Sequence, residues 1–217
     1  MIAAFFDLDN TILSTSSGRL WIRYLRQTRR LSRRQEAAIW GWIGLYALGL
    51  LDFPHLMVRV MAGATGQDEA ETWALCWRWF DELVSGYVAE GARAAIERHR
   101  AEGHHVAIVT ASTPYAAGPV AAHLGLGDAY LATRLEVRAG RFTGKLIEPA
   151  CHGAGKVYWV DRYAAERGID LASSFFYTDS INDLPLLERV GHPVAVNPDR
   201  TLTRLARQRG WPTVRFY

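Results

Sequence analysis

The chain has 217 residues, of which 49% are hydrophobic and 22% charged, a composition typical of ordinary globular proteins. Its 25 basic and 22 acidic residues leave a formal net charge of +3, an excess too small to indicate a nucleic-acid partner. The two cysteines, Cys76 and Cys151, lie far apart without a CxxC pair, so the sequence suggests neither a zinc knuckle nor a disulfide framework. This usage of cysteine favours the cytoplasm.

The first residues, 1–6, are apolar and run directly into Asp7. Because they contain no basic segment and no cleavage site, they predict a buried strand rather than a signal peptide. Three more apolar runs, at 106–110, 174–178 and 193–196, have the composition of buried parallel strands. Helical patterns separate these runs, and this alternation predicts an α/β fold with a parallel sheet.

Strand patterns disappear between the first two runs, where the sequence becomes a series of helical segments rich in Arg, Leu, Trp and Ala. We interpret residues 16–85 as an inserted helical cap domain. Residues 1–15 and 86–217 then form the core domain. Within that core, we expect a helix over 86–102 and a small hairpin over 135–144.

Inside the expected cap, Ser32 and Gln35 have the spacing of a capping box at a helix start. The apolar stretch 39–51 is well short of the roughly 20 residues that cross a bilayer, so we expect a buried helix there. Six arginines lie within residues 23–34. A solvated helix face is the favoured interpretation, over contact with anionic substrates or with acidic lipid headgroups.

Pairs of acidic residues follow two of the predicted strands. Asp7 and Asp9 come after the first strand, and Asp179 and Asp183 come after the strand at 174–178. Ligands bind at the carboxyl edge of open parallel sheets, so the two pairs should converge there. Carboxylates from different strands make a hard-oxygen site suited to Mg²⁺. Alone, Asp7 and Asp9 could equally be turn or helix-capping residues.

The same edge should carry groups that bind an anion. The hydroxyl of Thr110, at the end of its strand, and the backbone amides of Ala111 and Ser112 can hold phosphate oxygens. Lys156 adds a compact positive charge near a predicted helix start. Cys151 and His152 precede this lysine, and for both we expect a packing role in the loop.

Together, these four elements resemble the motifs of the haloacid dehalogenase superfamily of phosphatases. The corresponding segments are Asp7-Leu-Asp9-Asn-Thr11, Thr110-Ala-Ser112, Lys156, and Asp179-Ser-Ile-Asn182-Asp183. The resemblance covers essentially the whole chain. It is closest to the phosphoserine phosphatase-like subfamily, which implies a Rossmann-like core with an inserted α-helical cap of the C1 type.

This resemblance implies a phosphatase reaction through an aspartyl-phosphate. Asp7 would be the nucleophile, and Asp9 would protonate the leaving oxygen and then activate water. The Asp7 carboxylate, the Asp9 backbone carbonyl and Asp179 would hold Mg²⁺. Asp9 also favours phosphatase over dehalogenase activity, because dehalogenases of the superfamily lack the second acid.

The remaining motif residues would bind the transferred group. The resemblance assigns phosphate binding to Thr110 and Lys156, with Asp183 orienting the lysine and Asn182 lining the pocket.

The substrate is less determined than the reaction. Phosphoserine-specific relatives place a glutamate nine residues after the nucleophile, where this chain has Ser16. We therefore expect another small phosphomonoester, such as histidinol phosphate, a similar amino-alcohol phosphate or a sugar phosphate. The alternatives are a lipid phosphate hydrolysed at a membrane surface, and an inactive phosphate-binding module, against which the intact Asp7 and Asp9 argue. The sequence carries no signal for an oligomeric state.

Overall fold

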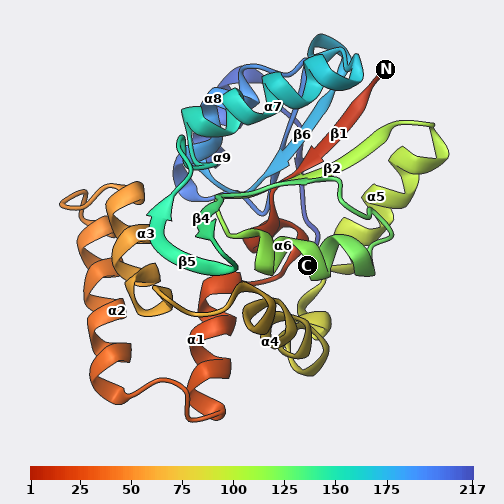
Figure 1. Cartoon of the computed structure of the whole chain (residues 1–217). Coiled ribbons are helices and arrows are strands. Elements are labelled where there is room, and N and C mark those ends of the chain that lie inside the picture. Colours follow the sequence, from red (N-terminus) through yellow and green to blue (C-terminus); the bar gives the residue numbers. More distant parts are fainter.

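The computed structural model describes all residues, 1–217, and contains a six-stranded parallel sheet covered by helices (Figure 1). The strand order is β3-β2-β1-β6-β7-β8. These strands are β1 (Ala3–Phe6), β2 (His105–Val109), β3 (Tyr130–Leu131), β6 (Phe175–Thr178), β7 (His192–Val196) and β8 (Thr213–Val214). The predicted α/β fold with a parallel sheet is confirmed, and all four predicted strands are present to within two residues at each end.

Nine α-helices accompany the sheet. In chain order they are α1 (Ser17–Gln27), α2 (Arg33–Ala47), α3 (Phe53–Met61), α4 (Glu69–Glu82), α5 (Glu90–Ala101), α6 (Pro114–His123), α7 (Ala154–Arg167), α8 (Leu184–Leu187) and α9 (Arg200–Arg209). Figure 1 shows α7, α8 and α9 on one side of the sheet and α5 and α6 on the other.

The central strand β1 is buried on both faces. Phe6 belongs to the hydrophobic cluster that includes Ile96 of α5, whereas its neighbour Phe5 belongs to the cluster that includes Val160 of α7. Successive side chains of a strand point to opposite faces, so a strand covered on both sides needs a continuous apolar run. This explains why the sequence before Asp7 has no polar residue.

Several local predictions needed correction. The helix expected over 86–102 begins only at Glu90, because residues 84–87 form a 3₁₀ turn and Val88 bridges Leu13. The edge strands β3 and β8 were not predicted, because two residues are too few to show a pattern. The predicted hairpin is present as β4 (Leu135–Arg138) and β5 (Arg141–Leu146).

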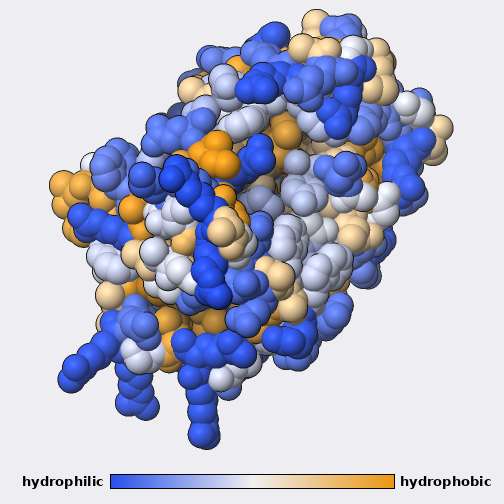
Figure 2. All heavy atoms as spheres, viewed as in Figure 1, coloured by the Kyte–Doolittle hydropathy of each residue, from blue (hydrophilic) through white to orange (hydrophobic).

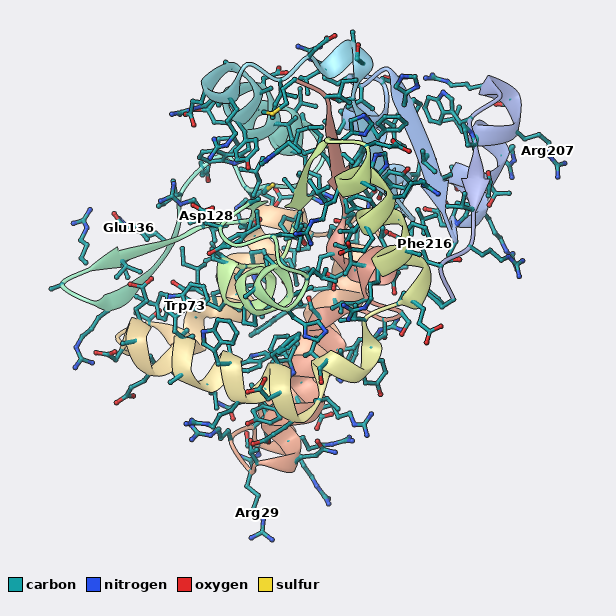
Figure 3. All side chains as sticks on the ribbon, turned by 90° about the vertical axis from the view of Figure 1, so that its right-hand side faces the viewer. Arg29, Trp73, Asp128, Glu136, Arg207 and Phe216 are labelled. Carbon is teal, nitrogen blue, oxygen red and sulfur yellow. The ribbon has the colours of Figure 1, made fainter.

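The segment between β1 and β2 contains α1 to α5 and no strand of the sheet. Ser32 and Gln35 form the predicted capping box at the start of α2. The arginines at 23–34 are exposed, as expected of a solvated face, and Arg29 extends away from the molecule (Figure 3). The division of the chain at residues 16 and 85 stays a prediction.

The expectation of a buried helix at 39–51 is wrong. No residue of α2 is buried, and beyond its end Leu48 and Leu50 are 74% and 72% exposed. The helix packs against α3 at the edge of the molecule, so its outer face meets solvent. Figure 2 shows hydrophobic side chains on this edge. None of the helices has the length and apolar character that crossing a membrane requires.

Candidate active site

The sheet brings the two acidic pairs to one edge. The backbone N–H of Asp7 donates to the carbonyl oxygen of Tyr177 at 2.8 Å, which ties the end of β1 to the end of β6. Asp179 follows β6 directly. The two carboxyls are near enough that Asp179 contributes to raising the pKa of Asp7. The predicted convergence of Asp7 and Asp179 is therefore observed.

Lys156 lies between two of the carboxylates. Its side chain is buried, with 2% of its surface exposed, and its Nζ donates to Asp7 Oδ1 and to Asp183 Oδ2, each at 2.7 Å. The lysine is on the first turn of α7, which points it toward the ends of the strands. Thr178 Oγ1 also donates to Asp183 Oδ2, at 2.6 Å. Asp183 is thereby close enough to orient Lys156, which is the role that the family resemblance assigns to it.

The cluster contains more acidic side chains than basic ones. Burial raises the pKa of Asp7 well above its usual range, and Asp183 and Asp179 raise it further although Lys156 lowers it. Burial, with Asp183, raises the pKa of Asp179 to about 7. Burial disfavours the charge of Lys156, but Asp183 and Asp7 outweigh it and raise the pKa of the lysine. Lys156 is therefore held as an ammonium among four acidic side chains, those of Asp7, Asp9, Asp179 and Asp183.

Asp9 is held by the start of α1. The backbone N–H of Ser17 donates to Asp9 Oδ1, and this amide lies at the helix N-terminus, where negative charge is favoured. Burial raises the pKa of Asp9, while the bond from Ser17 lowers it. Our sequence analysis missed Ser17. The run Ser14-Thr-Ser-Ser, typical of a helix N-terminus, was the available signal.

The second motif lies beside this helix start. Thr110 is fully buried, and its Oγ1 accepts a hydrogen bond from the backbone N–H of Ser112 at 3.0 Å. The hydroxyl of Ser112 is 3.0 Å from that of Ser17, which links the motif to the Asp9 loop. Thr110, Ala111 and Ser112 thus form a turn against the acidic cluster, with the last two partly exposed.

Helices α2 and α3 reach this edge through two aromatic residues. Tyr46 Oη lies 3.3 Å from His152 Nε2 and accepts a hydrogen bond from Asn182 Nδ2 at 3.5 Å. The ring of Phe53 stacks on His152, with centroids 4.3 Å apart. Tyr46 and Phe53 were not predicted, because nothing in their local sequence distinguishes them from packing residues. Burial raises the pKa of the Cys151 thiol to about 12, which agrees with a packing role.

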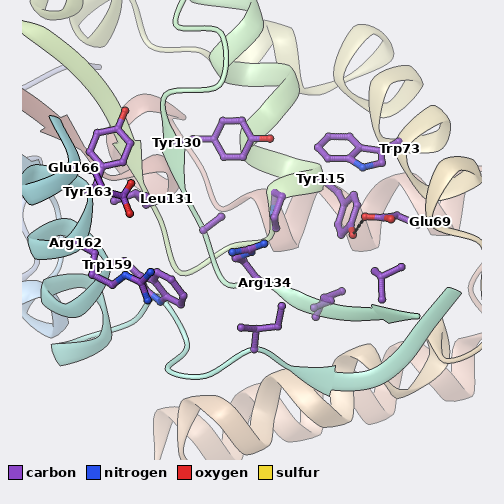
Figure 4. A pocket seen from close by; sticks show the side chains of 15 residues that line it. Glu69, Trp73, Tyr115, Tyr130, Leu131, Arg134, Trp159, Arg162, Tyr163 and Glu166 are labelled. Atoms are coloured by element: carbon purple, nitrogen blue, oxygen red, sulfur yellow. Dashed lines mark hydrogen bonds between the residues drawn. The ribbon is translucent and has the colours of Figure 1, made fainter. Parts of the chain in front are cut away.

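A separate cavity of about 580 Å³ lies beside the edge strand β3 (Figure 4). Trp73, Tyr115 and Tyr130 line it on one side, and Arg134 and Trp159 line it on the other. None of the predicted site residues lines it. The acidic cluster, not this cavity, is therefore the candidate active site.

Comparison with known proteins identifies the family. The family model described as haloacid dehalogenase-like hydrolase matches residues 4–188. The chain belongs to this family. The match includes all four motifs and the helical segment between the first two of them.

Two curated relatives are similar over nearly the whole chain. The phosphoserine phosphatase SerB1 of Mycobacterium tuberculosis is 36% identical over 214 residues, which cover 96% of this chain and 69% of that protein. The histidinol-phosphatase of Neisseria meningitidis is 31% identical over 218 residues, covering 98% of each. A crystal structure of a Bordetella pertussis protein of unknown function has a TM-score of 0.91 and 30% identity, covering 99% of this chain and 98% of that one. The chain is accordingly a phosphoric monoester hydrolase.

Proposed function

We propose that the enzyme hydrolyses a small phosphomonoester with the help of Mg²⁺, through a phosphoryl group carried on Asp7. The observation that carries this proposal is the position of Lys156, whose ammonium is bonded to the carboxylate of Asp7 at 2.7 Å. A phosphoryl group transferred to Asp7 would have a fixed positive charge beside it. Such preorganised charge is a main source of catalysis in phosphoryl transfer.

In the first step, a carboxylate oxygen of Asp7 bonds to phosphorus, and the bond from phosphorus to the leaving oxygen breaks. Asp9 donates its proton to that oxygen, and the burial that raises its pKa favours the protonated form this step needs. In the second step, Asp9 takes a proton from water while the water oxygen attacks phosphorus. Inorganic phosphate then leaves, and Asp7 is restored as a carboxylate.

The phosphoryl oxygens that do not react need donors. Lys156 supplies an ammonium close to Asp7. The turn of Thr110, Ala111 and Ser112 supplies hydroxyls and the backbone amide of Ala111, while the amide of Ser112 donates to Thr110 Oγ1 and holds the turn. Asp183 accepts bonds from Lys156 and Thr178, which restricts the lysine to one orientation. These groups can position the phosphoryl group without moving during the reaction.

The donor set fits Mg²⁺. Asp7, Asp179 and the backbone carbonyl of Asp9 are oxygen ligands, and the excess of carboxylates over the single ammonium favours binding of a divalent cation. When bound, the ion would supply positive charge to the phosphoryl oxygens during transfer.

We expect phosphatase activity to disappear when the enzyme is treated with a chelator and to return when Mg²⁺ is added. Ca²⁺ should inhibit, because its longer bonds and looser coordination would displace the Asp7 carboxylate from the phosphorus. Initial rates measured in metal-free buffer with each ion added back would check this. Full activity in chelator-treated protein, shown to be metal-free by elemental analysis, would contradict it.

We assign substrate choice to the segment of residues 16–85, which we take to be the cap domain. Tyr46 and Phe53 are the residues of its second and third helices that contact His152 and Asn182 beside the acidic cluster. The leaving group of a phosphomonoester bound at Asp7 would meet these side chains. The name of the histidinol-phosphatase relative supports an amino-alcohol phosphate as the first substrate to assay. The name of the other relative supports phosphoserine, whereas Ser16 argues against it.

We expect Tyr46→Phe to change the relative kcat/KM values of different phosphomonoesters by roughly 2- to 10-fold, the scale of one hydrogen bond. The substitution keeps the ring but removes the hydroxyl that contacts His152 and Asn182. Trp40→Phe is the matched control, because Trp40 is an exposed aromatic of the same helix. An equal change for every substrate would show that Tyr46 does not contribute to specificity.

The lipid-phosphate alternative is favoured by one observation, the exposure of Leu48 and Leu50 at the turn between α2 and α3. These leucines could enter a membrane surface and bring the acidic cluster to a lipid headgroup. Cosedimentation with vesicles containing a phosphatidic acid, with Leu48→Ser/Leu50→Ser as the comparison, tests this. Binding that the double substitution abolishes would support a lipid substrate, and no binding would exclude it.

The central experiment is an assay of purified protein with Mg²⁺ against a panel that includes histidinol phosphate, phosphoserine, sugar phosphates and phosphatidic acid. Hydrolysis of one water-soluble ester with a much higher kcat/KM than the others would establish the substrate. No hydrolysis of any of them, while phosphate still binds, would favour an inactive phosphate-binding module. The reducing cytoplasm is where we expect this activity, since both cysteines are free thiols.

A further inference from the structure

A group of three potential metal ligands lies at the end of α5, where the chain turns into β2. The side chains are those of His99, Glu102 and His104, and their donor atoms all lie within 4.8 Å of one another. The two Nδ1 atoms of the histidines are 2.9 Å apart. Glu102 Oε2 is 3.4 Å from His104 Nδ1 and 3.9 Å from His99 Nδ1.

We infer that His99, Glu102 and His104 bind a transition-metal dication, with Zn²⁺ as the ion that best fits. Two imidazoles and one carboxylate are a donor set that zinc uses in proteins, with a water molecule as the fourth ligand. At the usual bond lengths of zinc, ligand atoms on one tetrahedral ion lie roughly 3.3 Å apart. The observed separations bracket this value, so small side-chain rotations would complete the site.

The backbone holds the three ligands in place. The N–H of Glu102 donates to Arg98 O at 3.1 Å, and the N–H of His104 donates to His99 O at 2.9 Å, which closes the end of the helix. Gly103, between the second and third ligands, has a φ of +76°, a conformation that favours glycine. The site is therefore built on a capped helix end instead of a free loop. The partial negative charge at the C-terminus of the helix also favours binding of a cation.

A second group orients the buried histidine. His99 Nε2 lies 2.8 Å from the hydroxyl of Tyr177, whose own ring stacks on Phe6 with centroids 4.4 Å apart. If Nε2 carries the proton and donates it to this hydroxyl, the lone pair of Nδ1 faces the other two ligands. Metal-binding histidines in proteins are commonly fixed in this way through their second nitrogen.

The competing arrangement is a chain of hydrogen bonds without a metal. Tyr177 would then donate to His99 Nε2, and His99 Nδ1–H would donate to His104 Nδ1. Arg98 Nη2, which donates to the Tyr177 hydroxyl at 3.5 Å, adds a positive charge that opposes a cation. The two arrangements place the His99 proton on different nitrogens. Only the first of them can bind zinc, so a measurement of zinc binding distinguishes between them.

The zinc site is distinct from the phosphatase site. The strand β2 runs from His105, next to the proposed ligand His104, to Val109, which precedes Thr110. Five strand residues span roughly 16 Å, so the two sites lie at opposite ends of the strand. The ion would fasten α5 to the sheet, and we therefore expect it to change stability rather than catalysis.

The test is a zinc titration of the full chain in an excess of Mg²⁺, followed by calorimetry. We expect one Zn²⁺ per chain that is lost in His104→Ala, with affinity lower by at least roughly 10²-fold, and a smaller loss of roughly 10-fold in Tyr177→Phe. His123→Ala is the control, because this exposed histidine lies on α6 outside the group. Co²⁺ in place of Zn²⁺ should give the visible absorption of a tetrahedral site in the parent protein and in His123→Ala, but not in His104→Ala.

Two ligand substitutions are used, His104→Ala and Glu102→Gln, and the side chains they replace are 14% and 49% exposed. The folding of both variants can therefore be checked independently by circular dichroism in metal-free buffer. Glu102→Gln should also weaken zinc binding while leaving phosphatase activity with Mg²⁺ unchanged. Equal zinc affinity and stoichiometry in the parent, His104→Ala and Glu102→Gln proteins would overturn the inference and leave the hydrogen-bond chain as the structure of this group. Zinc binding that raises the melting temperature of the parent but not of His104→Ala would support it.

Discussion

Replacing Asp7 by asparagine is expected to lower phosphatase turnover by at least roughly 10⁴-fold, because the amide cannot form the covalent bond to phosphorus. The fold should survive. Asparagine has nearly the shape of aspartate, and Lys156 would keep its bond to Asp183. Removing one acid from a cluster with excess negative charge should leave thermal stability in metal-free buffer unchanged or higher. Steady-state rates and thermal unfolding of the same preparation check both parts.

The variant Asp9→Asn distinguishes the role of Asp7 as nucleophile from the role of Asp9 as acid and base. With an aryl phosphate, whose leaving group needs little protonation, this variant should still transfer the phosphoryl group to Asp7 but hydrolyse it roughly 10²-fold more slowly. The phosphorylated protein should then accumulate and be visible as a mass increase that alkali removes. The double variant Asp7→Asn/Asp9→Asn should not become phosphorylated. If it does, the nucleophile is another residue.

Lys156→Met should abolish activity and also destabilise the protein by about 3–5 kcal/mol, the usual cost of removing one partner from a buried ion pair. The loss arises because Asp7 and Asp183 remain buried without the ammonium that both contact at 2.7 Å. Chemical denaturation measured without Mg²⁺ would give the change in the free energy of unfolding.

The double variant Lys156→Met/Asp183→Asn provides the control for this explanation. Neutralising Asp183 removes one of the unpaired charges, so part of the lost stability should return while activity stays absent. The two substitutions should therefore be strongly non-additive, as expected for residues in direct contact. Additive effects of Lys156→Met and Asp183→Asn on stability would show that the charge pairing observed here contributes little.

The acidic residues at the centre of the site could be predicted because each of them follows an apolar run that is easily identified as a strand. Asp7 and Asp179 directly follow apolar strands, and parallel pairing of β1 with β6 places them together. Ser17, Tyr46 and Phe53 could not be found in this way, since their roles depend on how distant helices pack. Burial along 39–51 was wrongly expected because an apolar run shows what a helix can bury, and not whether a neighbour is present to cover it.

The bond between Ser17 and Asp9 has a mechanical consequence. Ser17 is the first residue of α1, so the amide that holds the proton donor belongs to the segment we take to be the cap. A hinge movement that lifted α1 would release the Asp9 side chain and break the contact of Ser17 with Ser112. The Asp9 carboxyl would then be placed to protonate the leaving oxygen only while the cap encloses the substrate. In the open enzyme the leaving oxygen would then have no proton donor in place, so phosphoryl transfer would require the cap to be closed.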